Sequence, residues 1–435
     1  MSLAQWELDL FIREKLEVHF RKIDIIQNTE VNPKRYSGPG TVSVKDGRLE
    51  YILHHALTDE ANDRTLQTGL YGEAGQVITA EQSFRFSGVD VHGRKWDALE
   101  TDTHRGVLGR NGAVVIGELQ CLRTEKKSAP IEENYVNYLI AVNGFFPRRG
   151  AMPEGRLDFT VQDINVCASI DEYGCELSIS GLHVDEVSSS AILKVLEMVS
   201  GCLFQVRAVE FHYSGACWME LRSINSDLSN RQLHPPIELS ALWPGKSLED
   251  FFSNFYGFFL MEGEKLYDYW YQLNRAWQGG FQAASLSICI FIEGVLREYF
   301  GPQGQDAEFH KLAEDSLSEV SKLKIDSRVI ELLKGSIRNA GQFKAKTALH
   351  LLEKNGAVSK GLPGKWTRLR NDSAHGVRAG EGYTAQQRQL DLTFNNLKLF
   401  YEIIFHLGGY EGSRIDYGTH GFPNKLGTTV QRVSP

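Results

Sequence analysis

The hydrophobic period of this chain changes once along its length, and this change limits what the chain can fold into. Before residue 234, apolar residues alternate with polar ones in short runs such as Leu49, Tyr51 and Leu53, which is the period of half-buried strands. After residue 247, apolar residues recur every three or four positions, which is the period of helices. We therefore predict an α+β chain in which a β-rich part precedes an all-helical part.

The change of period coincides with the segment HPPIELSALWPGKS (234–247), whose three prolines indicate a domain boundary. A chain of 435 residues also exceeds what one hydrophobic core usually supports. We expect an N-terminal helical or irregular segment at 1–35, a β-rich domain at 36–245 and an α-helical domain at 246–435. Many short strands separated by Gly, Asn and Asp turns favour a sandwich or a barrel-like fold for the β-rich domain.

Helices are expected throughout the second part, and one is expected at 188–201 beside the strands. The last helix has a capping-box start at Thr384 and Gln387, a glycine stop at Gly408-Gly409 and one continuous apolar stripe. The tail after residue 410 looks irregular. The predicted ranges of the second part are 248–276, 281–300, 306–323, 327–339, 343–354, 364–375 and 384–408.

Composition excludes several classes of protein. The six cysteines form no CxxC pair and have no His-x3-5-His partner, which argues against a zinc ribbon or a disulfide scaffold and favours a reducing, cytoplasmic setting. The first 20 residues carry charges throughout, unlike a signal peptide. No run approaches the roughly 18 apolar residues of a membrane span. We expect no membrane association, no resident metal and no cofactor.

The charge is unevenly distributed along the chain. The net charge is −8, yet the segment from Lys311 to Arg370 has 13 Lys or Arg against six Asp or Glu, an excess of seven positive charges. The rest of the chain therefore carries −15, since −8 minus +7 is −15. Such a segment is either a solvated helical face or a surface that attracts a polyanion.

Three further patterns have ordinary structural explanations. The PGKS segment (244–247) lacks the first glycine of a phosphate-binding loop, because Ser240 stands in its place. Glu100, Asp102 and His104 alternate, so on a strand they would share one face, with Asp90 and His92 nearby. These residues could form a metal site, or they could be polar residues on the solvent-facing side of the sheet. The aromatic run at 251–277 is interpreted as core, with a base-stacking platform or an interface as the alternative.

The segment KWTRLRNDSAHG (365–376) concentrates more chemistry than any other. In a helix Asn371 and His375 are four residues apart and share a face, and Arg370 lies at its edge. Gly376 suits a left-handed C-cap, so His375 is expected in the last turn, where the helix dipole favours the imidazolium. The alternative is that all three side chains only stabilise the helix end.

These residue types suit cleavage of a phosphodiester by its own 2′-hydroxyl. Histidine, with an ordinary pKa of roughly 6.5, transfers protons near neutral pH. The planar fork of arginine matches phosphate oxygens and keeps its charge. Asparagine can orient the histidine or the ribose. The reaction requires no metal.

The motif RNDSAHG, followed by a loop and a long closing helix, resembles the R-N-x3-H motif of the HEPN superfamily (higher eukaryotes and prokaryotes nucleotide-binding). The helical half behind a β-rich half further resembles the ApeA-type HEPN proteins of bacterial antiphage defence. The resemblance covers the motif and about 190 residues of helical pattern. The β-rich half matches more loosely, through its layout and through the stretch from Phe84 to Gly88.

This resemblance implies a dimeric, metal-independent endoribonuclease of an abortive-infection system, with RNA, including tRNA, as substrate. Arg370 and His375 fall on the catalytic pair, Asn371 on the supporting polar position, and Glu293 at a place where an acid would face the motif. The β-rich half would be a sensor, with a phage-derived protein as a candidate trigger.

Two other hypotheses remain open at this point. The first is a catalytically silent HEPN module that binds RNA, nucleotide or a partner protein. The second is a β-sandwich binding protein with a helical dimerisation domain. A digestion assay on RNA separates both from the ribonuclease.

Overall fold

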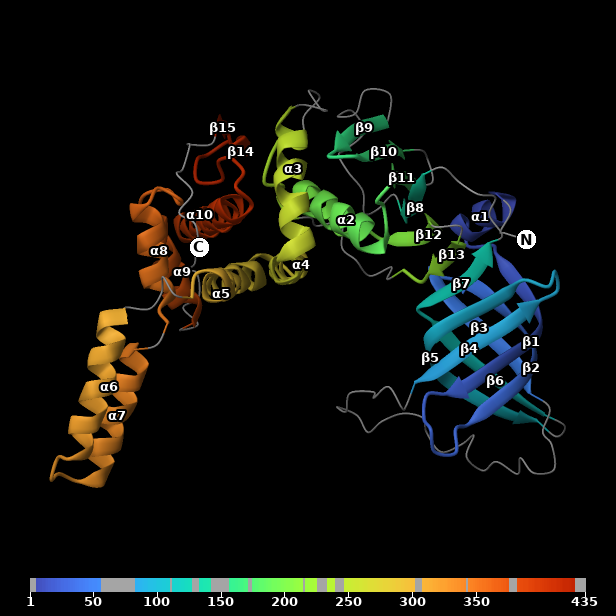
Figure 1. Cartoon of the computed structure of the whole chain (residues 1–435), viewed down its shortest axis with the longest axis horizontal. Helices are drawn as coiled ribbons and strands as arrows, with labels where there is room; N and C mark the ends of the chain where they lie inside the picture. The colour runs from blue at the N-terminus through green and yellow to red at the C-terminus, as the bar shows by residue number, and fades with distance from the viewer. Residues whose placement is uncertain are drawn as a thin grey trace. The chain divides into compact units, whose positions relative to one another are not determined.

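The chain divides into two compact units (Figure 1). Unit 1 comprises Met1–Ser190 and Phe204–Asn230, and unit 2 comprises Ala191–Leu203 and Arg231–Pro435. The change of unit near residue 230 falls just ahead of the predicted proline-rich boundary. The structure is a computed structural model that describes residues 5–55, 83–109, 112–126, 133–141, 156–170, 174–213, 216–224, 233–238, 246–301, 307–341, 343–374 and 382–426.

Unit 1 contains the predicted β-rich structure. In the described part of the chain, 13 strands form one sheet in the order β4-β1-β2-β3-β6-β5-β7-β13-β12-β8-β11-β10-β9. The strands are β1 Glu17–Gln27, β2 Arg35–Lys45, β3 Arg48–His55, β4 Phe84–Asp90, β5 Lys95–Gly109, β6 Gly112–Leu119, β7 Cys121–Lys126, β8 Asn134–Ala141, β9 Arg156–Val161, β10 Ile164–Ile170, β11 Gly174–Gly181, β12 Val206–Tyr213 and β13 Ala216–Arg222. Helix α1 Gln5–Ile12 belongs to the same unit, whereas α2 Glu186–Ser200 begins in unit 1 and belongs to unit 2 from Ala191 onward.

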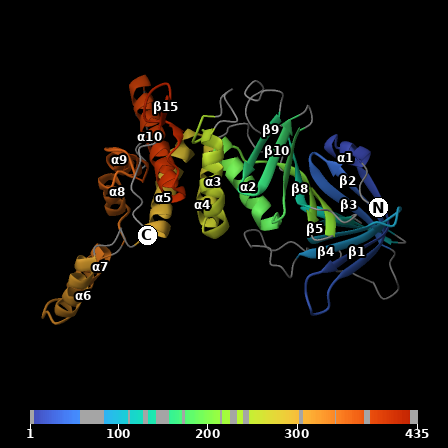
Figure 2. The same cartoon turned by 45° about the horizontal axis from the view of Figure 1, so that its top comes forward.

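Half of this sheet closes on itself. Strand β5 pairs with β6 and also with β4, which completes the ring β4-β1-β2-β3-β6-β5 (Figure 1), and Figure 2 shows β1, β4 and β5 side by side. The first residues of β5 also pair with β7, so the sheet continues into β7–β13 and beyond. Buried Phe86, Trp96 and Tyr51 belong to the core inside the ring. The barrel-like alternative is therefore correct for this half of the sheet.

The prediction for residues 1–35 was wrong in one respect. Strand β1 occupies Glu17–Gln27 and pairs with both β2 and β4, so this segment belongs to the sheet. Its pairing shifts register between Phe20 and Ile23. Because this bulge inserts a residue, the apolar positions change phase and the alternation that marks a strand is lost from the sequence.

Unit 2 is helical, as predicted. Besides the larger part of α2, its described helices are α3 Lys246–Met261, α4 Glu264–Gln278, α5 Phe281–Tyr299, α6 Ala307–Ser321, α7 Ser327–Gly341, α8 Ala345–Lys354, α9 Leu362–Ala374 and α10 Tyr383–Gly408. The single helix predicted at 248–276 is two helices, which separate at Gly263. A Cβ at Gly263 would lie 2.6 Å from the Cα of Phe259, so this tight turn requires glycine.

Helix α10 is the central helix of unit 2. It contacts α3, α5 and α9. Between Asn395 and Phe405 the helix is buried on every side, so its buried surface is wider than the single apolar stripe that was predicted. It ends at the left-handed Gly409, as predicted for a glycine stop. Its start is not a capping box, because Gly382 is the N-cap and the Gln387 amide donates to Asp391 instead.

The aromatic run at 251–277 is mainly core, as interpreted from its spacing. Phe251, Phe252, Phe255 and Trp270 are fully buried. The tail is less irregular than expected, since β14 Ser413–Ile415 and β15 Asn424–Leu426 form a small antiparallel pair. Among the described helices, none is both long enough and apolar enough to cross a membrane.

Candidate active site

The motif lies on α9, and its sequence explains how this helix is positioned. Gly361 has a φ of +87°, and Pro363 follows in the first turn, where a missing N–H costs nothing. One turn before the motif, Trp366 is buried and its indole N–H donates to the carbonyl of Cys289 on α5 at 3.3 Å. Leu369 is fully buried. One face of α9 is therefore held in the core, while Arg370 and Asn371 are exposed.

The loop before α9 is tied to α10 by a buried carboxylate. Glu402 is 3% exposed, and its two oxygens accept hydrogen bonds from the backbone N–H and the hydroxyl of Ser359, both at 2.6 Å. Lys398 lies 3.9 Å from the same carboxylate. Buried charges are stable only when they are paired in this way. The start of the motif helix is thus fixed to the central helix of unit 2.

Glu293 contacts Arg370, and its position is the one that the resemblance implies for an acid facing the motif. The Nε of Arg370 donates to Glu293 Oε2 at 3.0 Å, and the guanidinium lies 5.8 Å from the centre of the Trp366 ring. The Arg370 side chain is 46% exposed. Among the described residues, the two terminal amino groups of this guanidinium have no acceptor. They are the pair of donors that a phosphate would engage.

Glu293 also receives a second, weaker partner. Arg297, one turn further along α5, lies 3.5 Å from Glu293 Oε1 and is 69% exposed. The carboxylate therefore lies between two arginines next to the motif. Arg370 is the better-placed partner because its contact is shorter and its side chain less exposed.

The two remaining motif residues differ in what can be said of them. Asn371 is an exposed residue of α9, in the turn before the helix ends at Ala374. His375 and Gly376 lie outside the described residues. The pairing of His375 with Arg370 or Asn371 and the glycine C-cap therefore stay predictions.

A cysteine beside the motif is not an alternative nucleophile. Cys289 lies on α5 and is 1% exposed. Burial raises the pKa of its thiol to about 12, with Arg370 lowering it and Glu293 raising it by smaller amounts. The thiol is thus protonated at neutral pH and lacks the thiolate that nucleophilic chemistry needs.

The basic segment ahead of the motif is mostly solvent-exposed. Lys344, Lys346, Lys354, Lys360 and Arg368 are exposed on α8, on α9 and in the turn between them. On α6 and α7 several positive charges are instead paired with nearby acids, as in Lys322 with Glu319 and Lys334 with Glu331. Exposed positive charge that could attract a polyanion therefore lies on the motif helix and on the segment before it.

The weaker candidates take structural roles or lie outside the described side chains. Helix α3 begins at Lys246, so the PGKS segment leads into a helix. Glu100, Asp102 and His104 lie in β5, but the pairing with β6 shifts between Thr103 and Arg105 and breaks the alternation there. Their side chains are outside the described ones.

Asp90, which was expected near that group, instead forms an ion pair with Arg94. It is fully buried and accepts hydrogen bonds from the side chains of Arg94 and Trp96 and from the backbone N–H of His92. A carboxylate that is satisfied in this way is not available to a metal ion.

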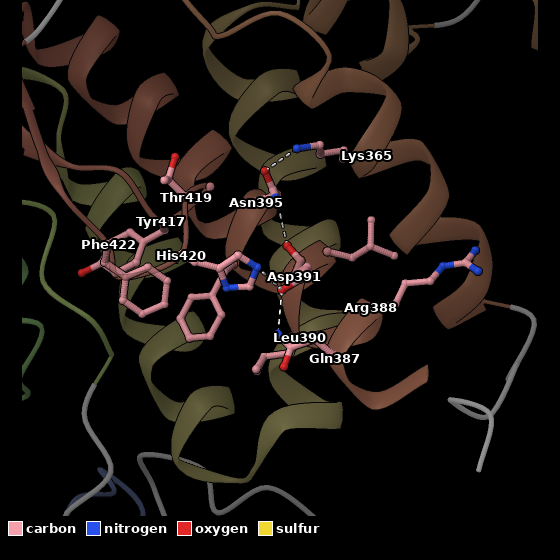
Figure 3. Close-up of a pocket in the computed structure, with 13 residues that line it drawn as sticks. Lys365, Gln387, Arg388, Leu390, Asp391, Asn395, Tyr417, Thr419, His420 and Phe422 are labelled. Carbon is pink, nitrogen blue, oxygen red and sulfur yellow. Dashed lines mark hydrogen bonds and ion pairs between the residues drawn. The ribbon is translucent and has the colours of Figure 1, made fainter. Parts of the chain in front are cut away.

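A pocket of about 310 Å³, which no sequence pattern predicted, lies beside α9 (Figure 3). It is lined by Lys365 of α9, by the first turns of α10 and by the segment that follows β14. Lys365 donates to Asn395 on α10 at 2.7 Å, whereas Arg370 bonds to α5, so the pocket and the motif use different neighbours of α9. The lining residues are Lys365, Gln387, Arg388, Leu390, Asp391, Leu392, Phe394, Asn395, Tyr417, Gly418, Thr419, His420 and Phe422.

The pocket combines basic groups with an aromatic wall. Phe394, Tyr417 and Phe422 contact one another with ring centres 4.7 to 6.0 Å apart. Arg388 and His420 are exposed at its edge. The sequence holds little signal for it, because its residues come from distant segments that only the fold brings together. Comparison of the chain with protein-family models, with curated proteins and with solved structures gave no match.

Proposed function

We propose that this protein is a metal-independent endoribonuclease of the HEPN type that acts in antiphage defence. The observation that carries the proposal is the Arg370–Glu293 pair at the exposed end of α9. Glu293 binds Nε of the guanidinium at 3.0 Å and so leaves its two terminal amino groups for a phosphate. His375, five residues further on, is the proton-transfer group that the motif supplies.

The proposed reaction divides the chemistry among these groups. The 2′-oxygen of the ribose attacks the adjacent phosphorus and loses its proton to His375, acting as the base. Arg370 stabilises the charge that develops on the phosphate oxygens. The bond from phosphorus to the 5′-oxygen breaks, and that oxygen is protonated as it leaves. The products are a 2′,3′-cyclic phosphate and a 5′-hydroxyl.

Two copies of the chain are expected to form the complete site, so that one histidine takes the proton and another gives it. Support comes from α5, where Leu286 and Ile290 are 42% and 56% exposed. They lie seven and three residues before Glu293, so they share its face of the helix. An apolar strip next to the catalytic pair suits a two-fold interface.

The remaining parts of the chain would serve recognition and control. RNA is the proposed substrate, with structured RNA such as tRNA as the expected class. The exposed lysines of α8 and Arg368 would guide its backbone by charge. Unit 1 would be the sensor, with a phage-derived protein as the candidate trigger, and the setting would be the cytoplasm.

The first experiment measures RNA cleavage by Arg370→Ala and His375→Ala. Each substitution is expected to reduce cleavage by at least about 100-fold, because general acid–base catalysis contributes factors of this size or more. Arg370 is half-exposed, so its substitution should change the free energy of unfolding by about 1 kcal/mol or less. Arg370→Lys should also fail, since an ammonium lacks the bidentate fork.

The controls address the mechanism and the resting state. Cleavage should continue in EDTA, and RNA with deoxyribose at the cleaved position should resist. Because the purified protein can require its trigger, a toxicity assay in cells accompanies the digestion assay. Cleavage of the deoxy-substituted RNA at the normal rate would show that the mechanism is wrong.

A second experiment tests the assembly. Ile290→Asp is expected to convert a dimer into a monomer and to abolish cleavage, because it places a charge in the proposed apolar interface. Light scattering at micromolar concentration measures the change. Leu332→Asp on α7, where the side chain is 71% exposed, is the matched control and should remain dimeric. A wild-type chain that is monomeric with and without RNA would refute the interface.

The second candidate function is a nucleotide-binding module without cleavage, and the pocket of Figure 3 favours it. Its aromatic wall suits a base, and Arg388 and Lys365 suit a phosphate. Isothermal titration of adenosine and guanosine nucleotides would detect such binding, and Arg388→Ala should weaken it. Nucleotide binding together with no cleavage in vitro and no toxicity in cells would favour this candidate.

A further inference from the structure

The hairpin of β12 and β13 brings three metal-ligating side chains together in unit 1. Glu210 and His212 are two residues apart on β12, so they share one face of the strand. Cys217 on β13 is the direct cross-strand partner of His212. Local sequence therefore places a carboxylate, an imidazole and a thiol at one point of the sheet.

The donor atoms converge on a single nitrogen. Glu210 Oε1 lies 3.0 Å from His212 Nε2, and Cys217 Sγ lies 2.9 Å from the same atom. The three donor atoms all lie within 4.8 Å of one another. His212 and Cys217 are 4% and 3% exposed, and the ring of Tyr135 stacks on His212 at 4.0 Å.

This geometry differs from that of a catalytic triad. In a Cys–His–Glu triad the thiol and the carboxylate bind opposite nitrogens of the imidazole, because the histidine relays a proton between them. Here both partners lie at Nε2, while Nδ1 is buried with no hydrogen-bond partner in the described part of the chain. One nitrogen has either one proton or one lone pair, so it cannot bond well to both groups.

A metal cation could bind all three donor atoms at once. Metal binding would replace the thiol proton of Cys217, and a cation would offset the repulsion between the resulting thiolate and the carboxylate of Glu210. Sulfur, imidazole nitrogen and carboxylate oxygen are also the three donor types that zinc accepts. Three protein ligands leave a fourth tetrahedral position open for water or for a ligand.

We propose that Glu210, His212 and Cys217 form a zinc(II) site with one open coordination position. This inference is independent of the proposed ribonuclease and departs from the expectation that the chain holds no metal. The site would fix the β12–β13 hairpin to β8, because Tyr135 of β8 packs on the histidine ring. Its open position would give the sheet of unit 1 a place to bind a water, an anion or a thiol.

The test is a cobalt(II) titration of the full chain after treatment with a chelator. Wild-type protein is expected to bind one equivalent and to show the thiolate-to-cobalt charge-transfer absorption in the near ultraviolet, and added zinc(II) should displace it. Cys217→Ala should lose this band. Glu210→Gln keeps the volume of the side chain and should weaken binding by at least about tenfold.

The matched control is Cys167→Ala, a half-buried cysteine on β10 of the same sheet. It should keep the band and the one-to-one stoichiometry. If Cys217→Ala does not fold, two other measurements test the site. The first is metal binding by Glu210→Gln. The second is whether zinc(II) protects the Cys217 thiol of the wild-type protein from an alkylating reagent. A wild-type protein without the charge-transfer band, or a band unchanged in Cys217→Ala, would overturn the proposal.

Discussion

Arg94 and Arg370 are both paired with carboxylates, yet their surroundings differ. Arg94 in unit 1 is 5% exposed, with its terminal amino groups on Glu7 at 2.7 and 2.8 Å and its Nε on Asp90 at 2.5 Å. Arg370 in unit 2 is 46% exposed and bonds to Glu293 through Nε alone. The first guanidinium has acceptors at all three nitrogens, and the second has one.

This difference separates a structural arginine from one that can bind a ligand. A buried guanidinium must have every donor satisfied, because desolvation of its charge is costly. A half-exposed guanidinium can leave donors to water and exchange that water for a phosphate. Burial and the number of acceptors, more than the pairing itself, therefore indicate which arginine is available for function. The predictions below test this distinction by its effect on stability.

The largest effect is expected from Arg94→Ala. It leaves the carboxylates of Glu7 and Asp90 buried without their cation, and breaking a buried pair in this way costs about 3–5 kcal/mol. Urea denaturation measures the loss in the free energy of unfolding. Arg370→Ala, with a cost of about 1 kcal/mol or less, is the comparison. Equal losses for the two variants would contradict the distinction.

A smaller effect is expected on acidification, again in unit 1. Burial alone raises the pKa of Asp90, but hydrogen bonds from Arg94 and Trp96 outweigh it, so the pKa lies below its ordinary value. Because the pKa of Asp90 is lower in the folded protein, its ionised carboxylate stabilises the fold above pH about 4. This stabilisation is lost as the pH falls through the folded-state pKa. Acid titration followed by tryptophan fluorescence should show that loss. In Asp90→Asn this part of the acid dependence should disappear.

The smallest effect on stability is expected at Glu293. Glu293→Gln keeps an oxygen acceptor for Arg370 Nε and should cost at most about 1 kcal/mol, as for other exposed pairs. Glu293→Ala should lower cleavage further than Glu293→Gln, because it releases the guanidinium. Arg297→Ala removes only the 3.5 Å contact to the same acid and should keep full cleavage. A loss of cleavage in Arg297→Ala as large as in Glu293→Ala would exclude a positioning role for Glu293.

Most helices could be predicted from sequence because their apolar period is local. The range 281–300 agrees with α5 at Phe281–Tyr299, and 384–408 agrees with α10 at Tyr383–Gly408. The errors occur where a tertiary contact intervenes. A bulge in β1 removed its alternation, and the close approach of Gly263 to Phe259 divided one predicted helix in two.

The candidate site was predictable only in part. The R-N-x3-H spacing identified Arg370 and Asn371 on the exposed end of a helix, since residues within two turns are close whatever the rest of the chain does. Glu293 is 77 residues away, and its contact with Arg370 depends on how α5 packs against α9. The cluster of Glu210, His212 and Cys217 is local to two consecutive paired strands, so the spacing E-x-H-x4-C could have revealed it had the pairing been recognised.

The sequence by itself determined the two classes of secondary structure, the place where one replaces the other, and the motif at the end of α9. These depend on hydrophobic period and short spacings, which act over one or two turns. Only the tertiary structure decided that β5 closes the ring onto β4, that Glu293 binds Arg370 and that Arg94 is fully enclosed by Glu7 and Asp90. Such contacts join residues 4 to 87 positions apart, and their partners are selected by which buried charges and apolar faces can be satisfied together.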